Sequence, residues 1–472
     1  MLRVHVRDFG PVQAGEVALR PLTLFIGPNN AGKSCLALLI YALCRAARHF
    51  SAGVITGMLH SPVERESRGA KSLQRAIETW AVQRGRRSPP RLFKELPEEA
   101  REALCVIMRS SNSLMVDTLA GELQRCFAGE LADLVRKNAR RNAFRLGIEQ
   151  DAPLLHLELR SSKEGLRTTK IRYDLSDQVV WRGTADSGVA FGAPGQLMDV
   201  MIERLRASLL SGLAQPAYYF PAARSGILQT HKALASALLT RSPLNGTEPG
   251  EVPRLSGVVV DFISNLLNVE TRRYHPEVSK VARFLESEVG RGRIDIAANE
   301  PKFAFPQICY KSMGATYPLQ RTSSMVSEIA PIVLFLKYLV NKGNLLIVEE
   351  PEAHLHPDSQ RTVARAIVRL IRMGVRVLVT THSDYFVQQI SNFIRLNQSP
   401  EERARLRYTE QDCLAATEVG AYLFSFGRRA TATTVQELEV TGQDGIPEDE
   451  FVRIAEAIYR ESVRARGVSK QG

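Results

Sequence analysis

An eight-residue glycine-rich loop constrains the fold of this chain more than any other feature. Residues 27–34, GPNNAGKS, match the pattern GxxxxGK[ST] in full. The apolar stretch PLTLFIG leads into this loop and is typical of a buried strand, and CLALLIYALCRAARHF after it is typical of a helix. Strand, loop and helix in this order form a cradle for phosphate groups. The backbone N–H groups of the loop and the N-terminus of the helix together supply a positive field.

Two side chains of the loop have specific expected roles. We expect Lys33 to reach the β- and γ-phosphates of ATP and Ser34 to ligate Mg²⁺. Asn29 and Asn30 also suit a tight turn, which is the simpler role for at least one of them. The sequence therefore predicts ATP and Mg²⁺ as cofactors. The residues expected to contact the nucleotide in this segment are Gly27, Asn29, Asn30, Ala31, Gly32, Lys33, Ser34 and Cys35.

A second stretch, LLIVEEPEAHLHP at residues 345–357, ends an apolar run with two adjacent carboxylates. A phosphate loop needs a carboxylate near Mg²⁺, at the carboxyl end of a neighbouring parallel strand. Glu349, the first acid after the run, is the candidate for an outer-shell Mg²⁺ contact. Glu350 should face elsewhere, because successive strand residues alternate faces, and it is the candidate general base for an attacking water. Solvated contacts of both acids at a strand end are the alternative.

The same stretch continues with a third acid and two histidines, Glu352, His354 and His356. A zinc site would require more cysteine or histidine ligands nearby at fixed spacing, and the neighbouring sequence supplies none. Pro357 instead suits the first turn of a helix. We therefore predict that these residues form an interface loop, and not a metal site.

A third apolar strand, in VRVLVTTHSD at residues 375–384, ends in Thr380, Thr381 and His382. A histidine at the exit of a central strand can contact the γ-phosphate and hold the attacking water; the alternative is a histidine that caps a turn. With Glu350 and Lys33, His382 completes the expected catalytic set.

Composition narrows the class of protein. The 472 residues are 44% hydrophobic, which is enough for a large core, and the net charge is +12. Arginine-rich clusters at 84–94 and 136–145 suit solvated helix faces or contacts with phosphate backbones. Six scattered cysteines argue against a disulfide scaffold or zinc ribbon. The N-terminus lacks a signal-peptide pattern and the apolar segment Ile329–Val340 is too short to span a bilayer, so we expect a soluble, cytoplasmic protein.

The remaining sequence alternates between helical and strand-rich regions. Residues 51–150 are predicted to be mostly helical, and short antiparallel strands are expected within 153–182. Three short stretches between 293 and 320 suggest a small sheet, and a long helix is expected from about Ser324 to Asn341. The sequence pattern after residue 404 predicts strands followed by an amphipathic helix from Glu448.

Taken in order, the phosphate loop, the helix that opens with TSSMVSE, LLIVEEPEAHLHP and VLVTTHSD resemble the ATPase heads of ABC-type proteins such as SMC and RecF. The chain is most similar to the prokaryotic AAA-like ATPases of the OLD (overcoming lysogenization defect) group, which carry GxNxxGKS, EEPExHLHP and THS motifs. The resemblance covers residues 1–50 and about 215–400. It implies an α/β P-loop NTPase with a mixed central sheet, flanking helices, a helical insertion and a short helical arm.

The resemblance also implies roles for individual residues. It places Glu349 at Mg²⁺, assigns the base to Glu350 and makes His382 the switch histidine, while His354 to Pro357 falls where such heads cross a dimer interface. Ser323 and Ser324 stand in the signature segment, which lacks the glycines of LSGGQ, and a plain helix cap is the alternative. Arg224, in YYFPAARSGI, suits either a nucleotide or partner sensor or an anchor for the turn.

The expected division of the chain follows from these motifs. Residues 1–50 and 301–400 form the two parts of the ATPase core, 51–150 a basic helical insertion, 151–223 a strand-rich lobe, 224–300 a helical arm and 401–472 a C-terminal unit of strands and a helix.

Three functions remain open at this point. The first is an ATPase that pairs through its heads as a homodimer or higher homo-oligomer and drives a separately encoded effector, in anti-phage defence or DNA metabolism. No DxD pattern occurs in the chain, so we expect no Toprim nuclease within it. The second is a nucleotide-gated scaffold with little turnover. The third is a repair ATPase that binds DNA through the basic insertion. No membrane partner is expected.

Overall fold

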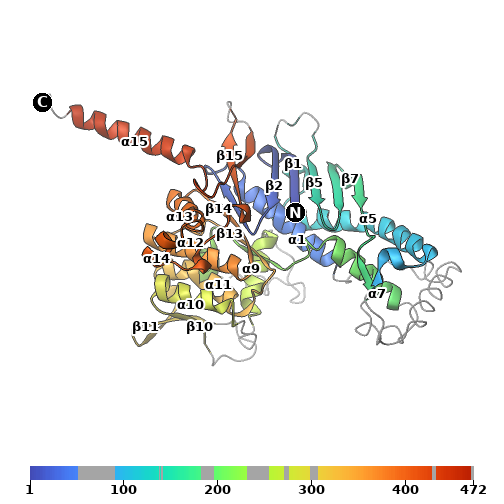
Figure 1. The fold of residues 1–472 in the computed structure, drawn as a ribbon, viewed down its shortest axis with the longest axis horizontal. Coiled ribbons are helices and arrows are strands. Elements are labelled where there is room, and N and C mark those ends of the chain that lie inside the picture. The colour runs from blue at the N-terminus through green and yellow to red at the C-terminus, as the bar shows by residue number, and fades with distance from the viewer. Residues whose placement is uncertain are drawn as a thin grey trace, which may run out of the picture.

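The computed structural model describes residues 1–51, 91–137, 139, 142–181, 196–230, 255–269, 276–297, 307–427 and 432–468. These residues form one large mixed sheet with helices packed against it (Figure 1). The predicted α/β class, with a mixed central sheet and flanking helices, is confirmed.

Eleven strands make up the large sheet, in the order β7-β6-β5-β1-β2-β16-β15-β3-β14-β13-β9. The strands are β1 (Leu2–Phe9), β2 (Val12–Leu19), β3 (Leu22–Ile26), β5 (Arg145–Gln150), β6 (Leu155–Ser162), β7 (Gly165–Tyr173), β9 (Ala217–Phe220), β13 (Leu345–Glu349), β14 (Arg376–Thr381), β15 (Val419–Phe426) and β16 (Thr433–Leu438). One end of the sheet, from β7 to β2, is antiparallel. The other, from β15 to β9, is parallel.

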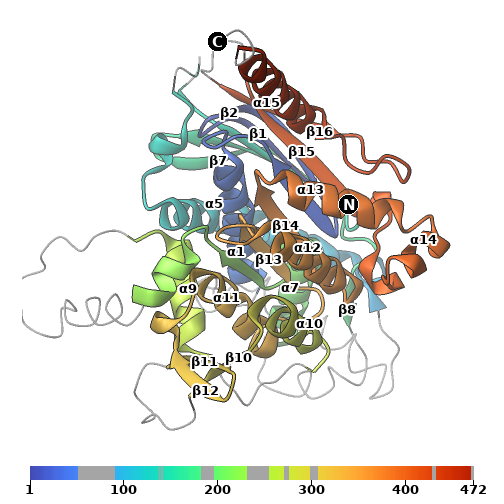
Figure 2. The same ribbon diagram turned by 90° about the vertical axis from the view of Figure 1, so that its left-hand side faces the viewer.

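Most of the helices pack around the sheet, and the last one, α15, projects from it (Figure 1). The helices are α1 (Lys33–Ser51), α5 (Glu98–Phe127), α7 (Gln196–Leu209), α9 (Gly257–Leu267), α10 (Ser279–Leu285), α11 (Ser324–Tyr338), α12 (Pro357–Arg372), α13 (Asp384–Arg395), α14 (Pro400–Arg405) and α15 (Asp449–Val468). Short strands pair β4 (Arg91–Leu92) with β8 (Val179–Trp181), and β10 (Arg293–Ile296), β11 (Ile308–Ser312) and β12 (Ala315–Pro318) form a separate small sheet beside α10 and α11 (Figure 2).

The parallel strands are covered on both faces, which explains why their sequences are apolar throughout. In β13, Leu345 and Ile347 pack in the core cluster that contains α1, α5 and α7, and Leu346 and Val348 pack in the cluster that contains α10 to α13. The alternation of side chains along one strand therefore joins two hydrophobic layers. The strand ends are held from both sides, which makes them a rigid support for functional side chains.

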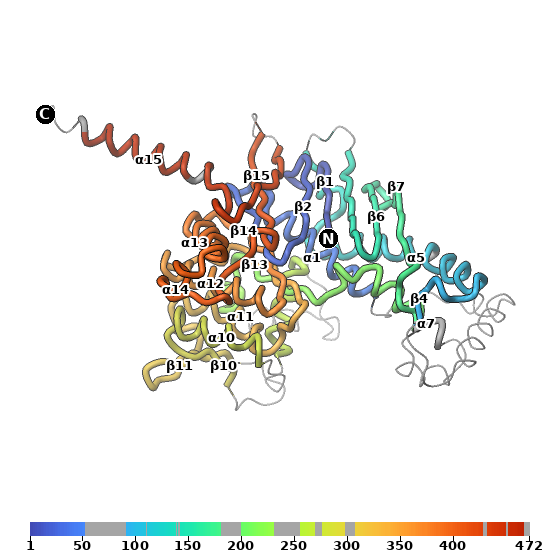
Figure 3. The backbone as a smooth tube through the Cα atoms, viewed as in Figure 1, coloured from blue at the N-terminus to red at the C-terminus, as the bar shows by residue number. Residues whose placement is uncertain are grey.

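The antiparallel strands are covered on one face only. In β1, Val4 and Val6 are buried against the layer of α5, and the alternating residues His5 and Arg7 lie on the opposite face. This pattern of apolar and polar residues is the expected signature of a half-buried strand. The backbone tube shows the N-terminus at this part of the sheet, away from α15, the last helix of the described residues (Figure 3).

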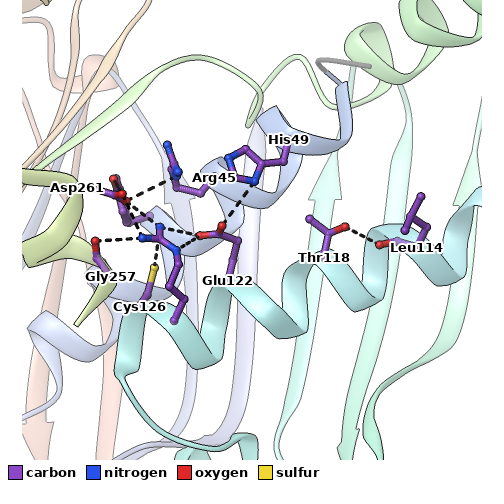
Figure 4. A network of polar contacts seen from close by, with 10 residues as sticks. Arg45, His49, Leu114, Thr118, Glu122, Cys126, Gly257 and Asp261 are labelled. Carbon is purple, nitrogen blue, oxygen red and sulfur yellow. Dashed lines mark hydrogen bonds and ion pairs between the residues drawn. The ribbon is translucent and has the colours of Figure 1, made fainter. Parts of the chain in front are cut away.

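A polar network ties α5 and α9 to the helix that follows the phosphate loop (Figure 4). Arg125 on α5 donates hydrogen bonds of 3.1 and 2.7 Å to the two carboxylate oxygens of Asp261 on α9, and a 2.8 Å bond to Glu122. Tyr41 on α1 donates a 2.8 Å bond to the same Asp261. Because the three helices share one partly buried carboxylate, α9 cannot shift relative to α1 without breaking charge-assisted bonds.

Most of the elements predicted outside the motifs are present. The strands within 153–182, the small sheet near 293–320 and the C-terminal strands and helix are confirmed. The structure differs at Arg145–Gln150, which form strand β5 and not part of a helical region; Leu146 and Ile148 are buried and alternate with residues on the open face. Residues 52–90, which hold Arg84, Arg86 and Arg87 and about two fifths of the predicted insertion 51–150, lie outside the described residues. The division into six segments stays a prediction.

Candidate nucleotide-binding site

Three parallel strands bring the sequence motifs together at one edge of the sheet. β14 lies between β3 and β13, with Thr381 opposite Ile26 and Thr380 opposite Glu349. The phosphate loop leaves β3 directly after Ile26, and His382 follows β14. Motifs separated by more than 300 residues in sequence therefore meet at the carboxyl ends of adjacent strands, where α/β proteins place their ligand sites.

The phosphate loop has the backbone conformation that its residue types allow. Gly27, Asn30 and Gly32 have positive φ angles of 144°, 62° and 90°. Glycine adopts such angles without strain, and asparagine tolerates the left-handed region better than most residues. Asn30 thus occupies a turn position, which is the simpler of the two roles predicted for it. Asn29 is exposed beside it, and Ala31 is buried under the loop.

Helix α1 begins at Lys33, so its N-terminus faces the space inside the loop. The Nζ atom of Lys33 donates hydrogen bonds of 2.7 and 2.8 Å to the main-chain oxygens of Gly27 and Pro28. Ser34 is exposed at the first turn, and burial raises the pKa of the Cys35 thiol to about 12, which keeps it protonated. Ser34 therefore has an accessible hydroxyl for Mg²⁺, whereas the Cys35 side chain offers no charged ligand.

The amine of Lys33 interacts electrostatically with three carboxylates at the end of β13. Burial lowers the pKa of Lys33, and the carboxylates of Glu350, Glu352 and Glu349 act in the opposite direction. All three acids at the end of β13 thus lie within electrostatic reach of the loop lysine. A triphosphate placed in the loop would bring further negative charge to the same amine and favour its protonated form.

Glu349 is buried, and donors from β9 and the following turn hold its carboxylate. The hydroxyl of Tyr219 donates a 2.6 Å hydrogen bond to Oε1, and the amide of Ala222 donates a 3.0 Å bond to Oε2. Burial and the neighbouring Glu349 raise the pKa of Tyr219, so the phenol stays protonated as a donor. Because both oxygens already have donors, the carboxylate suits contact with Mg²⁺ through water better than direct ligation.

Glu350 leaves the strand in a left-handed conformation, with φ of 44°, which turns its side chain away from that of Glu349. Its Oε1 lies 3.6 Å from Nδ1 of His382. The side chains of Glu350 and His382 remain 31% and 46% exposed, so both can reach a solvent molecule or ligand. The structure thus brings together the residues predicted to be the general base and the switch histidine. The assignment of these roles stays a prediction.

Glu352 belongs to this site and is buried within the chain itself, and the contact of its loop with another subunit stays a prediction. It is only 5% exposed, and its Oε1 accepts a 2.7 Å hydrogen bond from the hydroxyl of Thr381 and a 3.0 Å bond from the amide of His382. The carboxylate thereby fastens the turn after β13 to the end of β14. Local sequence gave no signal for this role, because it depends on the contact of Glu352 with Thr381, 29 residues away.

The two histidines of the stretch have separate positions. His356 caps α12, where its Nδ1 accepts a 3.3 Å hydrogen bond from the amide of Asp358. His354 has a positive φ of 58° in the preceding turn. Within the described ranges, no group of three or more histidine, cysteine or acidic residues has the arrangement of a metal site. The contact of His354–Pro357 with another subunit stays a prediction.

Arg224 is fully buried and anchors the end of β13. Its guanidinium donates bonds of 2.6 and 3.1 Å to the main-chain oxygens of Glu349 and Glu350, and it lies 3.0 Å from a carboxylate oxygen of Glu328. Burial lowers the pKa of Arg224, and Glu328 is the foremost of the acids that oppose this. Of the two roles left open by the sequence, this geometry favours the anchor, because the side chain has no access to a ligand.

The signature serines lie at the start of α11. Ser323 caps the helix by accepting a 3.4 Å hydrogen bond from the amide of Val326, and both Ser323 and Ser324 are exposed. Among the described residues, no hydrogen bond joins either serine to the phosphate loop of the same chain. The same helix carries Glu328, so the serines connect with the end of β13 through Arg224.

The residues present fit ATP and Mg²⁺. The loop supplies a lysine amine and a helix N-terminus for phosphate oxygens, Ser34 supplies a hydroxyl, and Glu349 supplies a fixed carboxylate behind it. No helix among the described residues is long and apolar enough to cross a membrane.

Comparisons with known proteins add a match at the family level. Residues 260–387 match the model of an AAA ATPase domain, a segment that contains α11, the acids at the end of β13 and His382. No curated protein matches the chain at a significant level.

Three solved structures of SMC heads share a distant likeness. An SMC head bound to the C-terminal winged-helix domain of ScpA has 10% identity and a TM-score of 0.41, covering 93% of this chain and 97% of that one. An SMC head with an extended coiled coil, bound to the C-terminal domain of ScpA from Pyrococcus furiosus, has 11% identity and a TM-score of 0.40, covering 97% and 100%. The SMC head from Thermotoga maritima has 9% identity and a TM-score of 0.37, covering 93% of this chain and 98% of that one. The family match, together with the loop and the acids at the strand ends, supports an ATP-binding domain of the AAA ATPase type.

Proposed function

We propose that the chain binds ATP with Mg²⁺ in the loop after β3 and hydrolyses it to ADP and phosphate. The observation that carries this proposal is the convergence of Lys33, Glu350 and His382 at the ends of three adjacent parallel strands. Bound Mg²⁺ would neutralise charge on the phosphates. Lys33 then holds the terminal phosphates, Glu350 accepts the proton of the attacking water, and His382 fixes the position of that water.

Turnover measurements on three variants test this assignment. Lys33→Ala is expected to lose nucleotide binding, while Glu350→Gln is expected to retain binding and to lower kcat by about 10²–10⁴-fold, the usual contribution of a general base. Asp358→Asn removes a carboxylate from the exposed start of α12 and serves as the control, with activity like that of the wild type. Unchanged hydrolysis in Glu350→Gln would contradict the assignment of the base.

We further propose that two heads pair in the presence of ATP, with the start of α11 from one copy facing the nucleotide of the other. The exposure of Ser323 and Ser324 at a helix N-terminus supports this arrangement, because such a terminus suits a γ-phosphate. The resemblance to OLD-group ATPases supports a role in anti-phage defence or DNA metabolism through a separately encoded effector. Molecular mass measured with and without ATP tests the pairing, and copurification of a neighbouring gene product tests the effector.

A nucleotide-gated scaffold with little turnover is the alternative within the same site. It predicts ATP binding and a change of mass on binding, with hydrolysis no faster in the wild type than in Glu350→Gln. The same measurements therefore separate an ATPase from a switch.

A second candidate function is DNA binding. A separate observation, on the open face of the antiparallel strands, supports it. Arg7, Arg145, Arg160 and Arg167 stand directly opposite one another on β1, β5, β6 and β7, and all four are exposed. With strands about 4.8 Å apart, this arginine row spans about 14 Å. Regularly spaced guanidinium groups suit a phosphate backbone.

The acids of the same face do not neutralise most of this arginine row. Glu149 lies 3.5 Å from His5 and 2.9 Å from His156, and Glu158 lies 2.8 Å from His156. Only Arg167 of the row has an acidic partner, Glu164, among the described residues. DNA contact is therefore supported at the open sheet face, and not only at the insertion that the sequence suggested.

A salt titration of DNA binding tests this candidate. Arg145→Ser combined with Arg160→Ser should weaken binding and reduce the dependence on salt, since each lost phosphate contact lowers the slope of log K against log salt by about 0.9. Arg293→Ser combined with Arg405→Ser removes the same charge from other exposed positions and is the control. Absence of DNA binding even at low salt would exclude the candidate.

A further inference from the structure

Helix α15, Asp449–Val468, is an amphipathic helix that projects from the body of the molecule (Figure 1). Every residue from 452 to 466 is exposed. Five large apolar side chains on it are 50–70% exposed: Val452, Ile454, Ile458, Tyr459 and Val463.

These five side chains share one side of the helix. At 100° per residue, they fall within an arc of about 180°, while Arg453, Glu456 and Arg460 lie on the other side. Glu456 and Arg460 form a 3.0 Å ion pair along that polar side. The helix therefore has the surface pattern of one that packs against a partner, and the described part of the chain leaves its five large apolar side chains exposed.

A helix of this kind is poorly stabilised alone. Helical propensity alone makes isolated helices only marginally stable in water, and most helices in proteins depend on the packing of an apolar face. Exposed contiguous apolar surface marks an interaction site. The apolar side of α15 thus requires an occupant.

The charges along α15 indicate which occupant fits. The half Asp449–Ile458 carries three acidic residues and one arginine, and the half Tyr459–Val468 carries three arginines and one glutamate, giving net charges of −2 and +2. A second copy of α15 running antiparallel would place the acidic half of each helix against the basic half of the other. Parallel pairing would place like charges together.

We propose that α15 pairs with α15 of a second copy of this chain as an antiparallel two-helix interface that forms without nucleotide. The apolar side chains run from Val452 to Val463, so the two-fold axis passes near Ile458 and brings Val452 of one helix close to Val463 of the other. Such an isologous contact closes on itself and yields a dimer. It lies on a different part of the chain from the proposed head pairing, so it holds two heads together when ATP is absent.

The mass of the full-length protein in solution, measured over a wide concentration range without nucleotide, tests this interface. The wild type and Lys33→Ala are expected to be dimeric, because the contact does not involve the nucleotide site. Ile458→Asp places a charge near the two-fold axis and is expected to give monomers. Ala457→Asp introduces the same residue on the polar side of the helix and is expected to remain dimeric.

Cross-linking tests the direction of pairing. A mixture of Val452→Cys and Val463→Cys chains should form a disulfide-linked dimer, whereas Val452→Cys alone should not, with the wild type as the control for native cysteines. A monomeric wild type, or dimerisation unchanged in Ile458→Asp, would overturn the proposal. Efficient linkage of Val452→Cys to itself would overturn the antiparallel arrangement. ATP hydrolysis by Ile458→Asp at the wild-type rate would leave the proposed function standing in any of these cases.

Discussion

The guanidinium of Arg224 donates a 2.6 Å hydrogen bond to the main-chain oxygen of Glu349, at the point where β13 ends. The same group holds the oxygen of Glu350 at 3.1 Å and pairs with the carboxylate of Glu328 on α11. One buried cation thus fixes the backbone of both acids at the end of β13 and links it to the helix that carries the signature serines. A nucleotide-dependent movement of α11 would therefore alter the contacts of Arg224 with Glu328.

Replacement of Arg224 by methionine should destabilise the protein. The change leaves Glu328, which is fully buried, without its cation, and breaking a buried ion pair from one side costs about 3–5 kcal/mol. Urea unfolding without nucleotide measures the loss. ATP turnover of the folded fraction should also fall, because Glu350 loses a contact that fixes its backbone.

The double variant Arg224→Met with Glu328→Met is the control for this mechanism. It removes both charges, and replacement of a whole buried ion pair by apolar residues is often neutral or stabilising. The double variant should therefore unfold at a higher urea concentration than the single one. Equal stability of the two would show that the unpaired carboxylate is not the cause of the loss.

Local sequence patterns were sufficient to predict the phosphate loop and the acids at the end of β13, because their function depends on residue order within one strand and one turn. The roles of Arg224 and Glu352 were not predictable in this way. Arg224 acts on a strand that lies 125 residues away in sequence, and Glu352 is buried only because its turn folds back onto β14. Strand β5 was missed because its arginine-rich surroundings concealed the short alternation of Leu146 and Ile148.

Truncation of Glu352 to alanine should lower kcat more than it changes KM. The change leaves the hydroxyl of Thr381 and the amide of His382 without their acceptor, so the histidine loses its fixed position. A loss of about tenfold in kcat corresponds to about 1.4 kcal/mol in the barrier. Steady-state ATPase kinetics provide the measurement.

Glu352→Gln distinguishes positioning from charge. Its amide oxygen can still accept from Thr381 and His382, so most of the activity lost in Glu352→Ala should return. If glutamine were as damaging as alanine, the negative charge near Lys33 would matter more than the hydrogen bonds.

Asp412 should make stability depend on pH in the acidic range. The carboxylate is fully buried; burial alone would raise its pKa, but hydrogen bonds from Arg365 and Arg369 outweigh this and hold the pKa well below its usual range. A group whose pKa is depressed in the folded state stabilises the fold above its unfolded pKa, about 3.9 for aspartate, and loses this contribution as the pH falls through its folded pKa.

The free energy of unfolding of wild type and Asp412→Asn, measured as a function of pH, checks this expectation. The wild type should be more stable by about 1–3 kcal/mol near neutral pH, the range for hydrogen bonds to a charged group. The difference should stay constant down to about pH 5 and shrink below about pH 4. A difference that grew towards low pH would have the wrong sign for a depressed pKa.

Gly27→Ala should destabilise the protein even without nucleotide, because two separate costs act at this position. Its φ of 144° strains any residue with a Cβ atom, at about 1–3 kcal/mol. A Cβ atom there would also lie 2.3 Å from the main-chain oxygen of Phe424 on β15, which cannot move without disturbing the central sheet. Gly165→Ala is a matched control, since Gly165 has a φ of 136° with nothing within 4 Å of the added atom, and it carries the strain alone. Thermal unfolding should therefore show a larger loss for Gly27→Ala than for Gly165→Ala. Equal losses would mean that the loop moves away from β15 at little cost, and a loop that moves so freely would not be preformed for phosphate.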